Sequence, residues 1–288
     1  MPALDSETFV AADGWELTVR RWDPEEPACA VLIAVHGMNE YSRAFAWPAP
    51  TWQAQGLRVY AYDQRGFGGD PERGLWPGAE ALTADLAEFT RLIAVRHPGL
   101  PLFLLGESMG GAVIILAAAS PERLPVAGLI LVAPAVAPWD SLPWLARAPL
   151  WLMAHSVPWL PLTGEGLDLR PTDNLEAWRA MSRDPLVLKE TRVDAIYGLA
   201  RLMDRAAEAA PELKDPTLLL YGQKDDFVRD WMTEELIAHA PAGLLETRIY
   251  DDGYHWLLRD DGKEVVLDAI RDWINDQGAD CPSEARVS

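Results

Sequence analysis

One serine of the chain stands in a sequence context that suits a nucleophile. Ser108 lies in Gly106-Glu107-Ser108-Met109-Gly110-Gly111, after a short apolar run and before an apolar helical stretch. A G-x-S-x-G segment between a strand and a helix forms a tight turn that lifts the serine hydroxyl above the sheet, and its glycines permit the strained backbone. A serine nucleophile also requires a base to take its proton and an acid to orient that base. The sequence therefore predicts a nucleophilic Ser108 with a histidine and a carboxylate as partners.

The chain has five histidines, and one of them is well placed to be the base. His255 follows the last apolar run in Asp251-Asp252-Gly253-Tyr254-His255-Trp256, on a loop at the same edge of the predicted sheet as Ser108. The other four suit structural roles, since they lie beside a buried strand, near helix ends or in a Trp-rich insertion: His36, His97, His155 and His239. His255 is the predicted base by position and by elimination.

The acid is expected on the loop after the preceding strand, which gives the chain order Ser, acid, His. There the apolar run Leu218–Tyr221 is followed by Gly222-Gln223-Lys224-Asp225-Asp226-Phe227-Val228. Chain order does not decide between Asp225 and Asp226, and a solvated loop charge is the alternative interpretation of either carboxylate.

The elements that position these residues alternate along the chain. An opening hairpin around Asp13-Gly14 and six further apolar runs predict eight strands, at Thr8–Ala11, Glu16–Trp22, Ala30–Val35, Leu57–Tyr62, Leu102–Leu105, Gly128–Val132, Thr217–Tyr221 and Glu246–Tyr250. Helical periodicity appears between them at Ala79–Arg96, Ala112–Ala119, Trp231–Ala240 and Glu264–Trp273. The pattern predicts an α/β fold with an eight-stranded, mostly parallel, doubly wound sheet.

The alternation is interrupted once, after the sixth predicted strand. Residues 134–213 show three helical patterns (Trp144–His155, Leu175–Ser182 and Val193–Ala209) and no strand pattern, which predicts a helical cap inserted between core segments 1–133 and 214–274. Residues 275–288 are expected to be a disordered tail. Three tryptophans of the cap are candidate substrate-binding residues that line an acyl channel or touch lipid: Trp144, Trp151 and Trp159. The simpler alternative is that this apolar stripe packs the cap onto the core.

Composition excludes several classes of function. A net charge of −19 repels phosphate backbones and anionic membranes, so a nucleic-acid partner is not expected. Two cysteines cannot build a disulfide framework or a zinc cluster: Cys29 is expected to be a small core residue, and Cys281 falls in the predicted tail. No metal or cofactor is implied.

The sequence also predicts where the protein resides. The apolar segment Pro143–Leu162 contains four prolines, Arg147 and His155, which argues against a transmembrane helix. No signal peptide is visible, so a cytoplasmic protein is expected. The oligomeric state stays open.

Several of these motifs together resemble the α/β-hydrolase superfamily, and within it the monoacylglycerol lipase and lysophospholipase-like serine hydrolases of the S33 type. The resemblance covers Thr8 to about Ile274 and rests on His36–Ser42, Gly106–Gly111, the Gly-x-x-Asp-x-x-Val run at 222–228 and Tyr254-His255. It implies that Ser108 is the nucleophile, Asp225 the acid and His255 the base, with an oxyanion hole formed by the backbone N–H groups of Met38 and Met109.

The chain also departs from this family. The family often has His where Glu107 stands, Gly where Asn39 stands, and a Gly-His-Gly-x-Ser run where this chain has Gly66-Phe67-Gly68-Gly69-Asp70. Glu107 places a carboxylate beside the nucleophile, which is expected to alter the pH profile.

The function predicted from the sequence is a serine carboxylic-ester hydrolase that works through an acyl-enzyme on neutral single-chain lipid esters, with at most transient membrane contact through the cap. A short-chain carboxylesterase, a C–C bond hydrolase and a proline iminopeptidase share the same triad and stay open as alternatives. A catalytically silent binding module is the alternative outside enzymes.

Overall fold

The structure of the chain is a computed structural model, which describes residues 3–5, 8–164, 166 and 169–282. These residues form a nine-stranded sheet in the order β1-β2-β3-β5-β4-β6-β7-β10-β11. The strands are β1 (Ala3–Asp5), β2 (Thr8–Val10), β3 (Glu16–Trp22), β4 (Ala30–Val35), β5 (Leu57–Tyr62), β6 (Leu102–Glu107), β7 (Gly128–Val132), β10 (Thr217–Gly222) and β11 (Leu245–Tyr250). All eight predicted strands are present, and β1 is an additional strand that pairs antiparallel with β2. From β5 to β11 every neighbouring pair is parallel.

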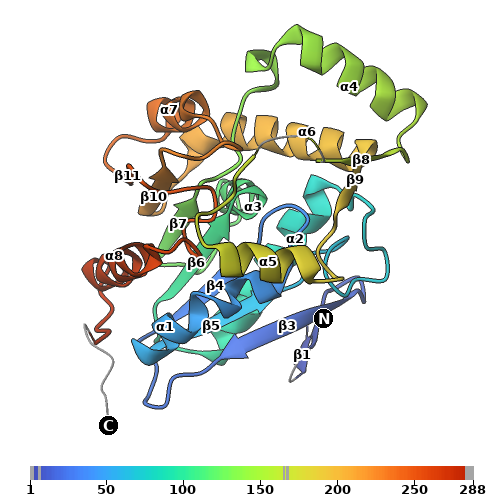
Figure 1. Cartoon of the computed structure of the whole chain (residues 1–288). Coiled ribbons are helices and arrows are strands. Elements are labelled where there is room, and N and C mark those ends of the chain that lie inside the picture. The colour runs from blue at the N-terminus through green and yellow to red at the C-terminus, as the bar shows by residue number, and fades with distance from the viewer. Residues whose placement is uncertain (1–2, 6–7, 165, 167–168, 283–288) are drawn as a thin grey trace.

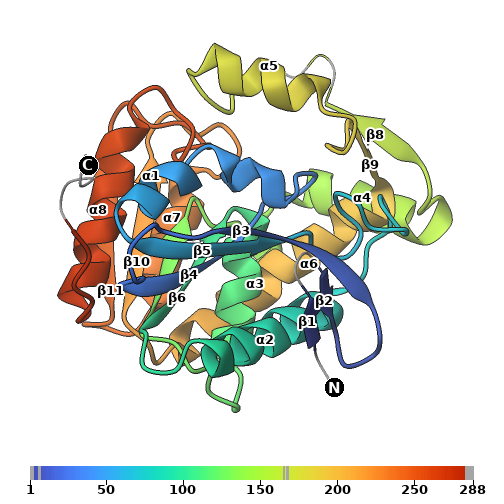
Figure 2. The ribbon, with the colours of Figure 1, turned by 90° about the horizontal axis from the view of Figure 1, so that it is seen from below.

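Helices cover both faces of this sheet because its central strands are apolar on both sides. In β4, Val31 and Ile33 belong to one core cluster, whereas Leu32 and Ala34 belong to the other. The first cluster is covered by α2 (Ala79–Arg96), α3 (Met109–Ala118) and α6 (Val193–Ala209), and the second by α1 (Ala49–Ala54) and α8 (Lys263–Asp276). Figure 2 shows α2 and α3 on one side of the sheet and α1 and α8 on the other. The doubly wound α/β architecture is therefore confirmed.

The segment between β7 and β10 carries the three predicted helices. They are α4 (Trp144–Ser156), α5 (Leu175–Arg183) and α6, and the Asn174 side chain accepts hydrogen bonds from the first turn of α5, as a helix N-cap does. The expectation of no strand there is wrong, because β8 (Pro161–Thr163) pairs antiparallel with β9 (Glu190–Arg192). These strands have three residues each, too few for a visible alternation. The remaining elements are α7 (Asp230–His239) and the 3₁₀ turns Ser42–Ala46, Trp139–Ser141 and Ala210–Glu212.

The helices of this insertion differ in how they contact the core. Leu202 and Ala206 of α6 are fully buried in the same cluster as α3, so α6 is part of the layer that covers the sheet. In contrast, α4 has no buried residue and lies on the outer side of α6 (Figure 1). Among the described residues, every helix is too short or too polar to cross a membrane.

Cys29 packs against one core cluster, as expected of a small core residue, but the two cysteines are paired with each other, which differs from the expectation. Cys29 and Cys281 form a disulfide, with Cα atoms 5.2 Å apart. Helix α8 ends at Asp276, after which Gly278 adopts a positive φ of 97° and the chain turns back toward Cys29. Hydrogen bonds of 2.8 and 2.9 Å between the Asn275 side chain and the Cys281 backbone hold this turn. The predicted disorder is therefore wrong for residues 275–282, and residues 283–288 lie outside the described part of the chain.

Candidate active site

Ser108 occupies a strained turn between β6 and α3. Its φ of 54° and ψ of −116° lie in a region that residues other than glycine rarely adopt. The turn is feasible because glycines flank it: a side chain at Gly106 would overlap the backbone of Gly110, and one at Gly110 would overlap the carbonyl oxygen of Val35. The Ser108 side chain is left partly exposed, in the sharp strand-to-helix turn that the sequence predicts.

The structure brings Asp225 and His255 together. Each lies on the loop that follows one of the adjacent parallel strands β10 and β11, so the two loops leave the same edge of the sheet. The His255 Nδ1 atom lies 2.7 Å from Asp225 Oδ2, and both side chains are buried. Asp225 Oδ1 accepts hydrogen bonds from the backbone N–H groups of Phe227 at 2.7 Å and Val228 at 2.9 Å. The position of this carboxylate is therefore fixed by three contacts.

Asp226, the alternative that chain order left open, makes a different set of contacts. Its side chain is partly exposed and accepts one long hydrogen bond of 3.4 Å from the backbone N–H of Arg170. No contact between Asp226 and His255 appears among the described residues. The geometry therefore pairs His255 with Asp225.

The protonation of His255 is controlled by its surroundings. Burial disfavours the charged imidazolium, but the Asp225 carboxylate outweighs this by charge and hydrogen bond, so the pKa of His255 is raised. Glu107 and Glu40 raise it further. With Nδ1 donating to Asp225, Nε2 is the ring nitrogen that accepts a proton. The Phe227 ring lies 4.9 Å from the imidazole, centroid to centroid, and packs against it.

The segment after β4 passes directly beside Ser108. A side-chain carbon placed on Gly37 would lie 3.3 Å from Ser108 Cβ, so the two segments lie very close together at Gly37. Met38 is the next residue after this close contact. Met109 is the first residue of α3, where helix N–H groups have no acceptor within the helix. Within the described part of the chain, neither the Met38 nor the Met109 N–H donates a hydrogen bond.

His36 shapes this segment, as its position in the sequence suggests. It is fully buried, its Nδ1 lies 2.8 Å from the Gly37 carbonyl oxygen, and its Nε2 accepts the backbone N–H of Gln64 at 3.0 Å. Burial lowers the pKa of His36 and keeps the ring neutral. Gln64 Nε2 donates to the His36 carbonyl at 2.8 Å, which closes a rigid polar network under the turn.

The loop that carries His255 is also tied to the insertion. Asp260 accepts hydrogen bonds from the Tyr254 N–H at 2.8 Å and from the Thr172 hydroxyl at 2.6 Å. The Trp256 N–H donates to the Pro171 carbonyl at 2.8 Å. Burial raises the pKa of Asp260 to about 6, against the opposing effect of these donors. These contacts were not visible in the sequence, because 88 residues separate Thr172 from Asp260.

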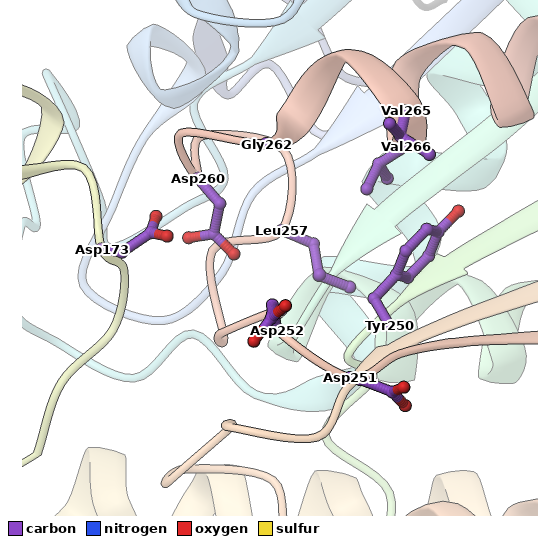
Figure 3. Close-up of a pocket in the computed structure, with 10 residues that line it drawn as sticks. Asp173, Tyr250, Asp251, Asp252, Leu257, Asp260, Gly262, Val265 and Val266 are labelled. Carbon is purple, nitrogen blue, oxygen red and sulfur yellow. The ribbon is translucent and has the colours of Figure 1, made fainter.

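A cavity of about 300 Å³ lies beside this loop, outside the Ser108–His255 region. Figure 3 shows its lining, with Asp173 and Asp260 facing each other from two loops and Leu257 beside Tyr250. Ser108, Asp225 and His255 are absent from its lining residues. In the described ranges, no group of three or more His, Cys, Asp or Glu side chains is arranged to hold a metal ion.

The tryptophans of the insertion lie on the surface. Trp144 and Trp151 of α4 have 68% and 50% of their surface exposed, and Trp159, which follows this helix, has 62% exposed. Leu145 and Leu152 of α4 are exposed as well. The simpler expectation, that this apolar stripe packs onto the core, is therefore wrong. Of the helices in the insertion, α6 packs into the core cluster of the sheet, whereas α4 has no buried residue.

Comparison with known proteins shows the family of the chain. The profile of the family described as "Serine aminopeptidase, S33" matches residues 26–262. A monoacylglycerol lipase of Mycolicibacterium smegmatis is 26% identical over 287 residues, with 93% of this chain and 95% of that protein covered. The human monoglyceride lipase is 28% identical over 291 residues, with 97% and 93% covered.

Solved structures share the fold. The monoacylglycerol lipase of Paleococcus ferrophilus superposes with a TM-score of 0.77 at 24% identity, over 92% of this chain and all of that one. A soluble variant of the Saccharomyces cerevisiae monoglyceride lipase, in complex with a substrate analog, gives a TM-score of 0.78 at 19% identity, over 96% and 94% of the two chains.

Proposed function

Because the chain belongs to the serine aminopeptidase S33 family of α/β-hydrolases, we propose that it is a serine carboxylic-ester hydrolase for neutral single-chain lipid esters. The observation that carries this proposal is the buried Asp225–His255 hydrogen bond of 2.7 Å, on loops that leave adjacent strands of the sheet that also carries the Ser108 turn. A strained serine, a buried His–carboxylate pair and two free backbone N–H groups are the parts that acyl transfer requires.

In the proposed reaction, His255 Nε2 accepts the Ser108 proton as Oγ attacks the ester carbonyl carbon. The charge that develops on the carbonyl oxygen is bound by the N–H groups of Met38 and Met109. His255 then gives the proton to the leaving alcohol, and the acyl group stays on Ser108. Water, deprotonated by His255, hydrolyses this acyl-enzyme and releases the acid, after which the proton returns to Ser108. Asp225 holds the imidazole in the required tautomer throughout.

The substrate class is proposed from charge and from the exposed stripe of α4. The stripe, defined as Trp144, Leu145, Trp151 and Leu152, presents apolar surface of the kind that binds lipid aggregates transiently. A net charge of −19 repels anionic lipids and fatty acids, and this repulsion weakens as salt is added. Neutral or zwitterionic monoesters therefore fit the chain best, in agreement with the monoacylglycerol lipases among its relatives.

The test has two parts. A fluorophosphonate probe should label the wild-type chain at Ser108 and should leave Ser108→Ala unlabelled. Turnover should fall by about 10⁶ in Ser108→Ala, because the members of a triad act as a unit. A few per cent of residual activity, or an adduct on another serine, would refute the assignment.

The second part is a series of neutral monoesters from two to sixteen carbons, with lysophospholipids and an N-terminal prolyl amide as comparators. Each additional buried methylene contributes about 0.8 kcal/mol, so kcat/KM should rise up to fourfold per carbon and then level off. A steady fall beyond four carbons would favour a short-chain esterase. Preferential cleavage of the prolyl amide would favour the aminopeptidase activity after which the family is named.

A further inference from the structure

A buried ion cluster lies beneath the proposed active site. The Arg259 guanidinium is 1% exposed and contacts two carboxylates: Glu40 Oε1 and Oε2 at 2.8 and 3.1 Å, and Glu107 Oε2 at 2.7 Å. Glu40 is 5% exposed and Glu107 is 1% exposed. The guanidinium also lies 4.2 Å from the centroid of the Trp256 ring. We refer to Glu40, Arg259 and Glu107 as the Glu40–Arg259–Glu107 cluster.

Each member of the cluster comes from a different segment of the proposed site. Glu40 is two residues after Met38, Glu107 directly precedes Ser108, and Arg259 is on the loop that carries His255. The segments are far apart in the chain: 219 residues separate Glu40 from Arg259, and 152 separate Glu107 from Arg259. The Arg259 side chain therefore connects the segment that contains Met38, the turn that contains Ser108 and the loop that contains His255.

Stability alone is a weak reason for such a cluster. Removing charges from water is costly, and a buried ion pair is often no more stabilising than apolar side chains of the same volume. The cluster is also unbalanced, since two carboxylates share one guanidinium, and Glu107 Oε1 has no hydrogen-bond partner in the described structure. Burial raises the pKa of Glu107 and the Arg259 charge opposes this, so above that pKa the arrangement brings an extra negative charge into the interior, close to His255.

We propose that the Glu40–Arg259–Glu107 cluster is a positioning device for the hydrolytic reaction, which fixes the three segments of the site to one another and stabilises the protonated form of His255 with its excess negative charge. The inference rests on the proposed function, because it assigns His255 the role of base. In the reaction His255 becomes an imidazolium when it takes the Ser108 proton, and a nearby negative charge lowers the free energy of that state.

Three carboxylates act on His255 in the folded protein: Asp225 directly, and Glu107 and Glu40 through space. Replacing Glu107 with Gln removes one of these charges and keeps a carbonyl oxygen that accepts the Arg259 hydrogen bond. The remaining Glu40–Arg259 pair is then balanced, so the fold should be retained. The pKa of His255 should fall, because its imidazolium loses a stabilising charge. The acid limb of the pH–rate profile should move to lower pH by about half to one unit.

The experiment measures the rate of inactivation by a neutral fluorophosphonate between pH 5 and 9, on the full chain, with the adduct mapped. Glu107→Gln should shift the acid limb downward, whereas Glu107→Asp, which keeps the charge, should stay within about 0.2 pH unit of the wild type. The matched control is Asp85→Asn, which neutralises a buried carboxylate paired with Arg65 at 2.7 Å on α2. It should leave the limb unchanged.

The outcomes separate this inference from the proposed function. A wild-type chain that is not labelled at Ser108 would refute both. Labelling at Ser108 with the same acid limb in Glu107→Gln and the wild type would overturn the inference alone and leave a merely structural ion pair. If Glu107→Gln does not fold, Glu40→Gln removes the same charge from the other carboxylate, and the same downward shift is expected.

Discussion

Replacing Asp225 with Asn should nearly abolish activity, and the contacts of this side chain explain why. Its Oδ1 accepts two backbone N–H groups, from Phe227 and Val228, and its Oδ2 accepts His255 Nδ1–H. An asparagine has one accepting oxygen, which the two N–H groups will hold, so its NH₂ group must face His255. The imidazole then has to accept at Nδ1 and carry its proton on Nε2, the nitrogen that must take the Ser108 proton.

The size of the effect follows from this change of tautomer. In serine proteases the equivalent substitution lowers kcat by about 10⁴, which corresponds to about 5.5 kcal/mol of transition-state stabilisation. Asp226→Asn is the matched control, because it makes the same chemical change one residue away. Asp226 is partly exposed and accepts a single bond of 3.4 Å, so its loss should lower kcat less than about fivefold.

The assay is kcat on a water-soluble neutral ester, with thermal unfolding monitored to confirm that both variants fold. More than a tenth of wild-type activity in Asp225→Asn would refute the tautomer argument. A larger loss in Asp226→Asn than in Asp225→Asn would show that the loop is shifted by one residue from the geometry described above.

Three further changes test other parts of the structure. The Cys29–Cys281 disulfide joins residues 252 positions apart, and its reduction should lower the free energy of unfolding by up to about 5 kcal/mol. Dithiothreitol should therefore lower the urea midpoint of the wild type. It should leave the midpoint of a double Cys→Ser variant unchanged. Burial raises the pKa of Asp260 to about 6, so the folded chain binds a proton that the unfolded chain releases near pH 4, and stability falls as pH rises through this range. In urea unfolding, the free energy of unfolding of Asp260→Asn should therefore increase by about 1–2 kcal/mol relative to that of the wild type as the pH is raised from about 5 to 7.5. If this difference does not change with pH, the assigned burial effect is contradicted. Replacing Trp144 and Trp151 with Ser should lower kcat/KM on micellar or vesicle-borne monoesters at least fivefold and leave a dissolved short ester unaffected; equal losses on both would contradict interfacial binding by α4.

Much of the core was predictable because its signals are local. Strands β4, β5 and β7 begin and end at the residues predicted for them, since each is an apolar run between turn residues and is buried on both faces. The Ser108 turn is equally local, because its glycines are required by contacts within a few residues and with the neighbouring strand. The Asn174 cap likewise lies next to the helix that it begins.

The rest depends on contacts between distant segments. Nothing near Asp225 or Asp226 in the sequence shows which of them faces His255, because the choice is made by how two loops leave adjacent strands. The partner of Glu107 is 152 residues away, so the sequence shows a carboxylate beside Ser108 but gives no sign that Arg259 binds it. The apolar stripe of α4 has the spacing of a buried helix face, and periodicity alone does not tell a core from an exposed lipid-binding surface.

The disulfide also determines how the molecule responds to force. The disulfide joins Cys29 directly to Cys281, so a force applied to the two ends of the chain is transmitted through this bond and not along the backbone between the two residues. Only the segments outside the link, which include β1–β3, are able to extend. Because β3 pairs with β5, a pull on the N-terminal side loads the sheet until this pairing separates. After that the residues between the two cysteines carry no load, whereas in the reduced chain they would extend as well. A single covalent bond thus limits how far a force applied at the ends can unravel the hydrolase core.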